Sequence, residues 1–178
     1  MAKLRDTTQA AITLLKETGI DNADFDAKLL ICHVMGYDKA QLITNSDHNL
    51  TAEETARIDG LIKRRAEREP VARILGVREF WGLPFELNGG TLEPRPDSET
   101  LIEAALAQCK GTSPKTILDL GTGTGCLLLS LLHEWPGATG IGADKSEKAL
   151  EQARTNAKRL ELDDRASFIQ SDWLNNIE

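Results

Sequence analysis

The sequence predicts an α/β protein in which a small helical bundle precedes a parallel sheet. Residues 1–70 carry only helical patterns, whereas the chain beyond Lys115 alternates between short apolar runs and helical segments. Such alternation predicts strands that pair in parallel through right-handed crossovers. The 178 residues are 40% hydrophobic and 28% charged, which is typical of a folded chain of one or two domains.

Four helices are expected in the first 70 residues, because apolar residues recur there at helical spacing. The clearest start is Thr51-Ala-Glu-Glu54, which has the spacing of a capping box. Pro70 limits the fourth helix, because the residue before a proline is pushed out of the helical region. The expected positions are about 4–16, about 24 to Gly36, a short helix from Asp38, and Thr51 to the approach of Pro70.

Residues 71–92 place aromatic residues among glycines and prolines, which predicts short strands and turns in a hairpin-like connector. The chain then divides into a helical domain (1–70), this connector and a sheet domain (93–178). Three parallel strands make half of a doubly wound sheet, so we expect the front part of a longer protein, whose first strand lacks a neighbour. The elements expected after the connector are helices at about 99–109, 126–135 and from Ser146, and strands at 116–120, 138–143 and 166–170.

Composition narrows the class of protein. No uncharged apolar run approaches 18 residues and the N-terminus lacks a signal-peptide pattern, so we expect a cytoplasmic protein without a membrane span. Cys32, Cys109 and Cys126 form no CxxC pair, which predicts neither a disulfide framework nor a metal site. The net charge of −7 argues against nucleic acid as a direct partner. The basic stretch Lys63-Arg64-Arg65, with Arg68 and Arg73, fits a solvated helix face better than a surface for an RNA or protein partner.

The strongest local signal is a glycine loop. An apolar strand ends at Leu120, Gly121-Thr122-Gly123-Thr124-Gly125 follows, and a helix starts directly afterwards. Gly121 permits a tight turn, while the later glycines let a ligand approach the backbone. Exposed N–H groups at the helix start favour a ligand oxygen. Taken alone, the pattern also fits an ordinary strand-to-helix turn.

Three further positions favour an adenosine-type ligand. Asp144 ends the next expected strand about 20 positions after Gly125, where an acidic residue meets a ribose hydroxyl in nucleoside-binding sheets. Asp172 follows the third strand and can accept a hydrogen bond from an adenine amino group. Trp173 beside it can cover the ring, although ordinary packing would also explain this tryptophan. The dinucleotide fingerprint G-x-G-x-x-G/A is not met, because Cys126 stands at its last position.

The loop and the acid before it, Asp119, resemble motif I of class I S-adenosylmethionine-dependent methyltransferases. The helical domain followed by EPVARILGVREFWGLPFEL, EPRPDSE, ILDLGTGTG and QSDW resembles, over the whole chain, the HemK/PrmC family of peptide chain release factor N5-glutamine methyltransferases. The family's usual I-P-R-P-[DE]-T-E segment is altered at Glu93 and Ser98, and residues 142–144 are less apolar than is typical. The resemblance implies a partial class I methyltransferase sheet of Rossmann-like fold.

The same resemblance implies a function in translation termination. S-adenosyl-L-methionine would be the cofactor, a glutamine side-chain amide of a release factor the substrate, and the helical domain the part that recognises this protein. The catalytic Asn-Pro-Pro-Tyr motif of the family has no match, since no two prolines are adjacent, so we expect no catalytic residue in this chain and no methyl transfer by it alone. The resemblance implies that Asp144 binds the ribose hydroxyls, that Asp172 and Trp173 bind the adenine, and that Arg95 and Pro96 lie near the active-site mouth. The residues implied to hold the methionine and ribose part of the cofactor are Asp119, Gly121, Thr122, Gly123, Thr124 and Gly125.

Three alternatives stay open. A relative that methylates a glutamine of a ribosomal protein fits the same residues. A dinucleotide-binding module without methyl transfer belongs to another class, and Cys126 argues against it. The third alternative is a non-catalytic fragment that serves structure or partner binding.

Overall fold

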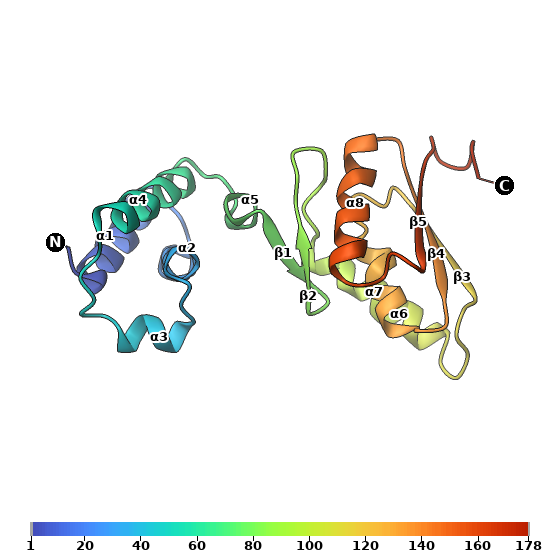
Figure 1. Ribbon diagram of the computed structural model, residues 1–178, viewed down its shortest axis with the longest axis horizontal. Coiled ribbons are helices and arrows are strands. Elements are labelled where there is room, and N and C mark those ends of the chain that lie inside the picture. Colours follow the sequence, from blue (N-terminus) through green and yellow to red (C-terminus); the bar gives the residue numbers. More distant parts are fainter. Residues whose placement is uncertain (1, 178) are drawn as a thin grey trace. The chain divides into compact units, whose positions relative to one another are not determined.

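The computed structural model describes residues 2–177 and divides into two compact units, unit 1 (Met1–Leu75) and unit 2 (Gly76–Glu178) (Figure 1). The division falls shortly after residue 70, where the sequence predicts the end of the helical domain. Within the described residues, no helix is long and apolar enough to cross a bilayer.

Unit 1 is helical, and its predicted helix starts are confirmed. The Thr51 hydroxyl accepts from the Glu54 N–H, and the Glu54 carboxylate accepts from the Thr51 N–H, which completes the capping box. Asp38 and Gln41 form a second capping box. The apolar faces of the longer helices share one buried core that includes Leu15, Leu30 and Ile58. The helices are α1 (Leu4–Glu17), α2 (Ala23–Met35), α3 (Lys39–Thr44), α4 (Ala52–Ala66) and α5 (Val71–Leu75).

Helix α5 corrects one sequence prediction. Residues 71–75 are expected in the strand-and-turn connector, but they form a helical turn because the Pro70 carbonyl accepts from the N–H groups of Arg73 and Ile74. A proline is tolerated at a helix start, where its missing N–H has no partner to lose. Ile74 is buried in the core of unit 1. The predicted hairpin is therefore shorter than the connector.

The hairpin belongs to unit 2 and consists of β1 (Val77–Phe80) and β2 (Leu83–Glu86), paired antiparallel. Phe80 and Phe85 are buried with their ring centroids 6.2 Å apart, edge to face. They share a core with Leu128 and Leu132 of the sheet domain. The hairpin thus supplies two of the buried aromatic side chains of the unit 2 core, which also contains Trp135.

The predicted parallel sheet is confirmed, with the strand order β3-β4-β5. It contains β3 (Thr116–Leu120), β4 (Thr139–Asp144) and β5 (Ala166–Gln170). Helices α6 (Glu99–Gln108), α7 (Cys126–Glu134) and α8 (Glu147–Arg159) lie on one side of the sheet, and a 3₁₀ turn, η1 (Pro96–Ser98), precedes α6 (Figure 1). In the part of the chain that is described, β3 pairs with β4 alone, and Leu118 on it is 43% exposed.

Two glycines in β4 let side chains from neighbouring segments pack closely against this strand. A Cβ atom on Gly140 would lie 2.5 Å from the Leu128 side chain of α7, and one on Gly142 would lie 2.8 Å from the Phe168 ring. Glycine is usually unfavourable inside a strand, but it is selected where another group approaches closely. The residues that weaken the strand pattern are therefore those that allow its packing.

Candidate functional site

A cavity of about 190 Å³ lies where the carboxyl ends of the three parallel strands meet. Open α/β sheets bind ligands at this edge. The structure brings together four residues that the sequence singles out from distant segments, Gly121, Asp144, Asp172 and Trp173. Their contacts with a cofactor stay a prediction. The full lining is Gly121, Ala143, Asp144, Lys145, Ser171, Asp172 and Trp173.

The glycine loop is fastened to the neighbouring strand. The N–H groups of Gly121 and Thr122 donate to the Ala143 carbonyl over 2.8 and 2.9 Å. Gly121, Gly123 and Gly125 have φ angles of 76°, 56° and 80°, a region that residues with a Cβ atom rarely adopt. A Cβ atom added to Gly121 would meet nothing within 4 Å, so the face of the loop there is open.

Asp119 accepts a hydrogen bond from the glycine loop and does not line the cavity. The Thr122 hydroxyl donates to Oδ2 of Asp119 over 2.7 Å. Burial raises the pKa of Asp119; the bond from Thr122 opposes this effect and the negative charge of Asp144 adds to it. Thr122, Gly123, Thr124 and Gly125 are likewise outside the cavity lining. For these residues, the structure shows how the loop is held, and their contact with a ligand stays a prediction.

Asp144 links the loop, β4 and α8. Its Oδ2 accepts from the Gly123 N–H and its Oδ1 from the Ser146 N–H, both over 2.9 Å. A carboxylate oxygen can accept two hydrogen bonds, so each oxygen keeps capacity for a ligand hydroxyl. The carboxylate is half-buried at the cavity, as a ribose-binding group requires.

Beside β5, the cavity is lined by an ion pair and by an exposed indole ring. Lys145 Nζ lies 3.1 Å from Oδ2 of Asp172. Trp173 is 71% exposed, so core packing does not account for it. Its φ of 56° is held by the Ser171 hydroxyl, which donates to the Trp173 carbonyl over 2.8 Å and accepts from the Asn176 N–H. This turn presents the indole to solvent beside the cavity.

Lys145 and Ser171 line the cavity but were missed as site residues by the sequence analysis. Each one adjoins a predicted acid at a strand end, and this adjacency was the available signal. Arg95 precedes η1 and Pro96 begins it, and neither lines the cavity, so their place near an active-site mouth stays a prediction. Among residues 2–177, no three His, Cys, Asp or Glu side chains are grouped so as to hold a metal ion.

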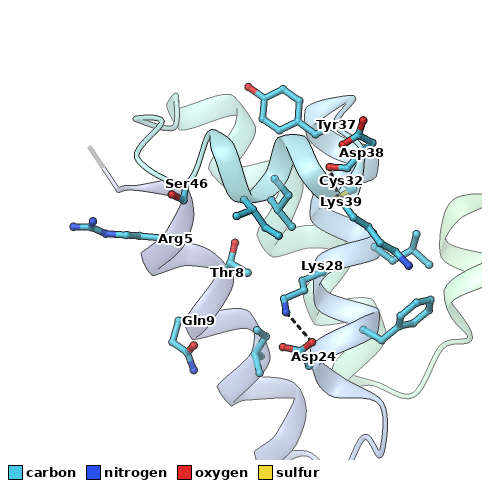
Figure 2. A pocket seen from close by; sticks show the side chains of 15 residues that line it. Arg5, Thr8, Gln9, Asp24, Lys28, Cys32, Tyr37, Asp38, Lys39 and Ser46 are labelled. Carbon is cyan, nitrogen blue, oxygen red and sulfur yellow. Dashed lines mark hydrogen bonds and ion pairs between the residues drawn. The ribbon is translucent and has the colours of Figure 1, made fainter.

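Unit 1 contains a larger cavity, of about 800 Å³, between α1, α2 and α3 (Figure 2). Its floor is apolar and includes Leu29 and the buried side chains of Ile12 and Leu42. Two large apolar residues at the cavity are exposed, Phe25 at 53% and Ile43 at 74%. This groove arises from the packing of three helices, and no local sequence pattern marks it.

Charged groups border this groove. Lys28 is paired with Asp24 over 2.8 Å, as Figure 2 shows. The Lys39 ammonium lies 5.0 Å from the centroid of the Phe25 ring, a cation–π contact. Its charge is therefore placed directly beside the exposed apolar surface.

Segments in both units are similar to known protein families. Residues 6–76 match the family described as PrmC N-terminal domain, and residues 112–178 match a family described as methyltransferase domain. Proteins named release factor glutamine methyltransferase are similar to this chain. The one from Bradyrhizobium diazoefficiens is 47% identical over 90% of this chain and 55% of the relative's length. The one from Rhodospirillum rubrum is 46% identical over 89% of this chain and 49% of the relative's length. The chain thus spans about half the length of these relatives. A solved S-adenosylmethionine-dependent methyltransferase from Geobacter sulfurreducens, in complex with S-adenosyl-L-homocysteine, is 34% identical over 44% of this chain and 30% of its own, with a TM-score of 0.36.

Proposed function

We propose that this chain is part of a release factor glutamine methyltransferase of the PrmC family. The protein containing these residues would transfer a methyl group from S-adenosylmethionine to a glutamine side-chain amide of a peptide chain release factor. It would act in the cytoplasm, where release factors meet the ribosome. The cofactor supplies an electrophilic methyl group on sulfur. The residues of this chain bind and orient that cofactor.

The observation that carries this proposal is the meeting of Asp144, Asp172 and Trp173 at one cavity beside the glycine loop. Asp144 would accept from the ribose hydroxyls, Asp172 from the adenine amino group, and the Trp173 indole would cover the ring. The cavity is smaller than the roughly 300–1,000 Å³ of whole-ligand pockets, so it fits the nucleoside end. The methionine end would lie over the open face at Gly121, where no Cβ atom intervenes.

Methyl transfer to an amide nitrogen places a second demand on the protein. The nitrogen lone pair is delocalised into the carbonyl, so acceptors must hold both amide hydrogens and aim the nitrogen along the methyl–sulfur bond. We assign Asp144 and Asp172 to the cofactor and assign no catalytic residue among residues 2–177.

Unit 1 would bind the release factor through the groove between α1, α2 and α3. An amphipathic helix laid into an apolar groove is a recurring mode of protein recognition. Phe25 and Ile43 offer exposed apolar surface at this groove, and the Lys39 ammonium stands over the Phe25 ring. The occupant that fits is an apolar segment of the release factor that carries a carboxylate to meet Lys39.

Labelled S-adenosylmethionine tests the proposal directly. The protein containing these residues should label purified release factor, and replacing the acceptor glutamine should abolish the signal. Calorimetry on the protein that contains these residues should show S-adenosyl-L-homocysteine binding that NAD does not compete away. Labelling of a ribosomal protein instead of release factor would establish the alternative substrate, and binding of NAD alone would contradict a methyltransferase.

A further inference from the structure

Asn156 of α8 joins the hairpin to the glycine loop. Its side chain is fully buried. Its Oδ1 accepts from the Glu86 N–H over 2.8 Å, and its Nδ2 donates to the Glu86 carbonyl over 3.1 Å and to the Thr124 carbonyl over 2.9 Å. Both amide hydrogens and the amide oxygen are therefore used, and they connect three segments that are far apart in the sequence.

The hydrogen bond from Asn156 to Thr124 holds a part of the glycine loop that, within the described chain, forms no hydrogen bond with the strands. The strands bond Gly121, Thr122 and Gly123 through Asp119, Ala143 and Asp144, as described above. Asn156 acts on the next residue, Thr124, from the helix side. The backbone of α8 approaches closely there, since a Cβ atom on Gly125 would lie 3.3 Å from that of Ala153.

We propose that Asn156 is a positioning residue for the cofactor site. Its amide fixes the Thr124 carbonyl and thereby the peptide plane that carries the Gly125 N–H, which closes the loop by donating to the Thr122 carbonyl. Because the same amide is bonded to Glu86, the geometry of the loop depends on the docked hairpin. This inference rests on the proposed function and adds a residue that lies outside the cavity and acts through the loop.

Arg159 provides a matched control on the same helix. Its Nη1 lies 2.6 Å from Oε1 of Glu86, and both side chains are more than two-fifths exposed. Arg159 therefore ties α8 to the same hairpin residue, and within residues 2–177 it forms no hydrogen bond with the glycine loop. Removing it loosens the hairpin attachment but leaves the Thr124 carbonyl bonded.

The test compares Asn156→Asp and Arg159→Ala in the protein that contains these residues, well below the unfolding temperature of each variant. Asn156→Asp preserves the shape and removes both donors. It should weaken S-adenosyl-L-homocysteine binding by about tenfold or more, as expected for a lost buried donor, whereas Arg159→Ala should stay within about twofold. Equal affinity of Asn156→Asp and the unaltered chain would overturn the proposal, as would equal losses in both variants.

Hydrogen exchange keeps the proposal testable even if Asn156→Asp folds poorly. In the unaltered chain, bound S-adenosyl-L-homocysteine should slow exchange of the Glu86 N–H, which lies outside the cavity and is bonded to Asn156. Unchanged exchange at Glu86 on binding would overturn the proposal. Without ligand, the Gly125 amide should exchange faster in Asn156→Asp than in Arg159→Ala. That comparison stands even if no ligand binds, an outcome that would contradict the proposed function alone.

Discussion

The N–H of Gly123 donates to Oδ2 of Asp144 over 2.9 Å, so the acid at the end of β4 also holds the glycine loop. Asp144→Ala would remove a ribose acceptor and release Gly123 together. We expect it to weaken S-adenosylmethionine binding by about 1.5–3 kcal/mol, because charge-assisted hydrogen bonds are lost. Calorimetry would measure this loss, with Asp163→Ala, an exposed carboxylate outside the cavity, as the control. Unchanged affinity in Asp144→Ala would exclude a ribose-binding role.

Ser171 should matter for binding although it carries no charge. Its hydroxyl holds the Trp173 carbonyl and so the left-handed backbone there. In a fluorescence titration, Ser171→Ala should weaken cofactor binding by about 0.5–1.5 kcal/mol, the usual value of one hydrogen bond.

Trp173→Gly relieves the strain of the positive φ but removes the indole ring, so the temperature midpoint of unfolding should be unchanged while the affinity for the cofactor falls. Fluorescence titration and thermal unfolding measure the two effects, and a Trp173→Gly variant with full affinity would show that the indole does not cover the ligand.

The sequence predicts most elements here because their signals are local. Capping residues mark α3 and α4, and the three parallel strands fall within a residue or so of their predicted ranges. Helix α5 was missed because five residues are too few for a periodic pattern. Asp144, Asp172 and Trp173 could be foreseen because parallel strands bring their carboxyl ends to one edge.

Contacts between distant residues could not be foreseen in this way. Asn156 meets Glu86 across 70 positions of sequence. Its helical spacing places it on the buried face of α8 with Ala149 and Ala153, but no local pattern identifies its hydrogen-bond partners. Lys145 finds Asp172 only once β4 and β5 are paired. The groove of unit 1 depends on how three helices pack.

Gly142 should not tolerate a larger residue, because the side chains of Thr122 and Phe168 pack directly against it. A Cβ atom there would come within 2.9 Å of the Thr122 hydroxyl and of the Phe168 ring. Gly142→Ala should therefore destabilise the chain by about 1–3 kcal/mol, as overpacking does, and weaken cofactor binding through Thr122. Gly137→Ala is the control, since a Cβ atom there meets nothing within 4 Å. Denaturant unfolding gives the free energies, and equal stability of the two variants would contradict the packing argument.

Asp119 should make stability depend on pH in a defined direction. Burial raises the pKa of Asp119 in the folded chain above the ordinary 3.8, because the buried site favours the protonated carboxyl. The resulting contribution to the free energy of unfolding is complete below pH 3.8 and is lost as the pH rises through the folded pKa. Asp119→Asn keeps an acceptor for Thr122 without the buried charge. At pH 7 it should unfold at a higher temperature than the unaltered chain, and the difference should shrink as the pH falls toward about 4. A difference that grows on acidification would show that folding favours the charged form.

The groove of unit 1 should affect a protein substrate and leave a small one alone. Ile43→Glu places a charge on the exposed apolar surface; because Ile43 is 74% exposed, the free energy of unfolding should change little. Burying an isoleucine in an interface is worth about 1.5–3 kcal/mol, so kcat/KM of the protein that contains these residues should fall about tenfold or more on intact release factor. On a short glutamine peptide that does not reach unit 1, kcat/KM should be unchanged. Leu14→Glu is the matched control, since Leu14 on α1 is 42% exposed and does not line the groove. Equal losses on both substrates, or equal effects of the two variants, would show that this groove does not receive the release factor.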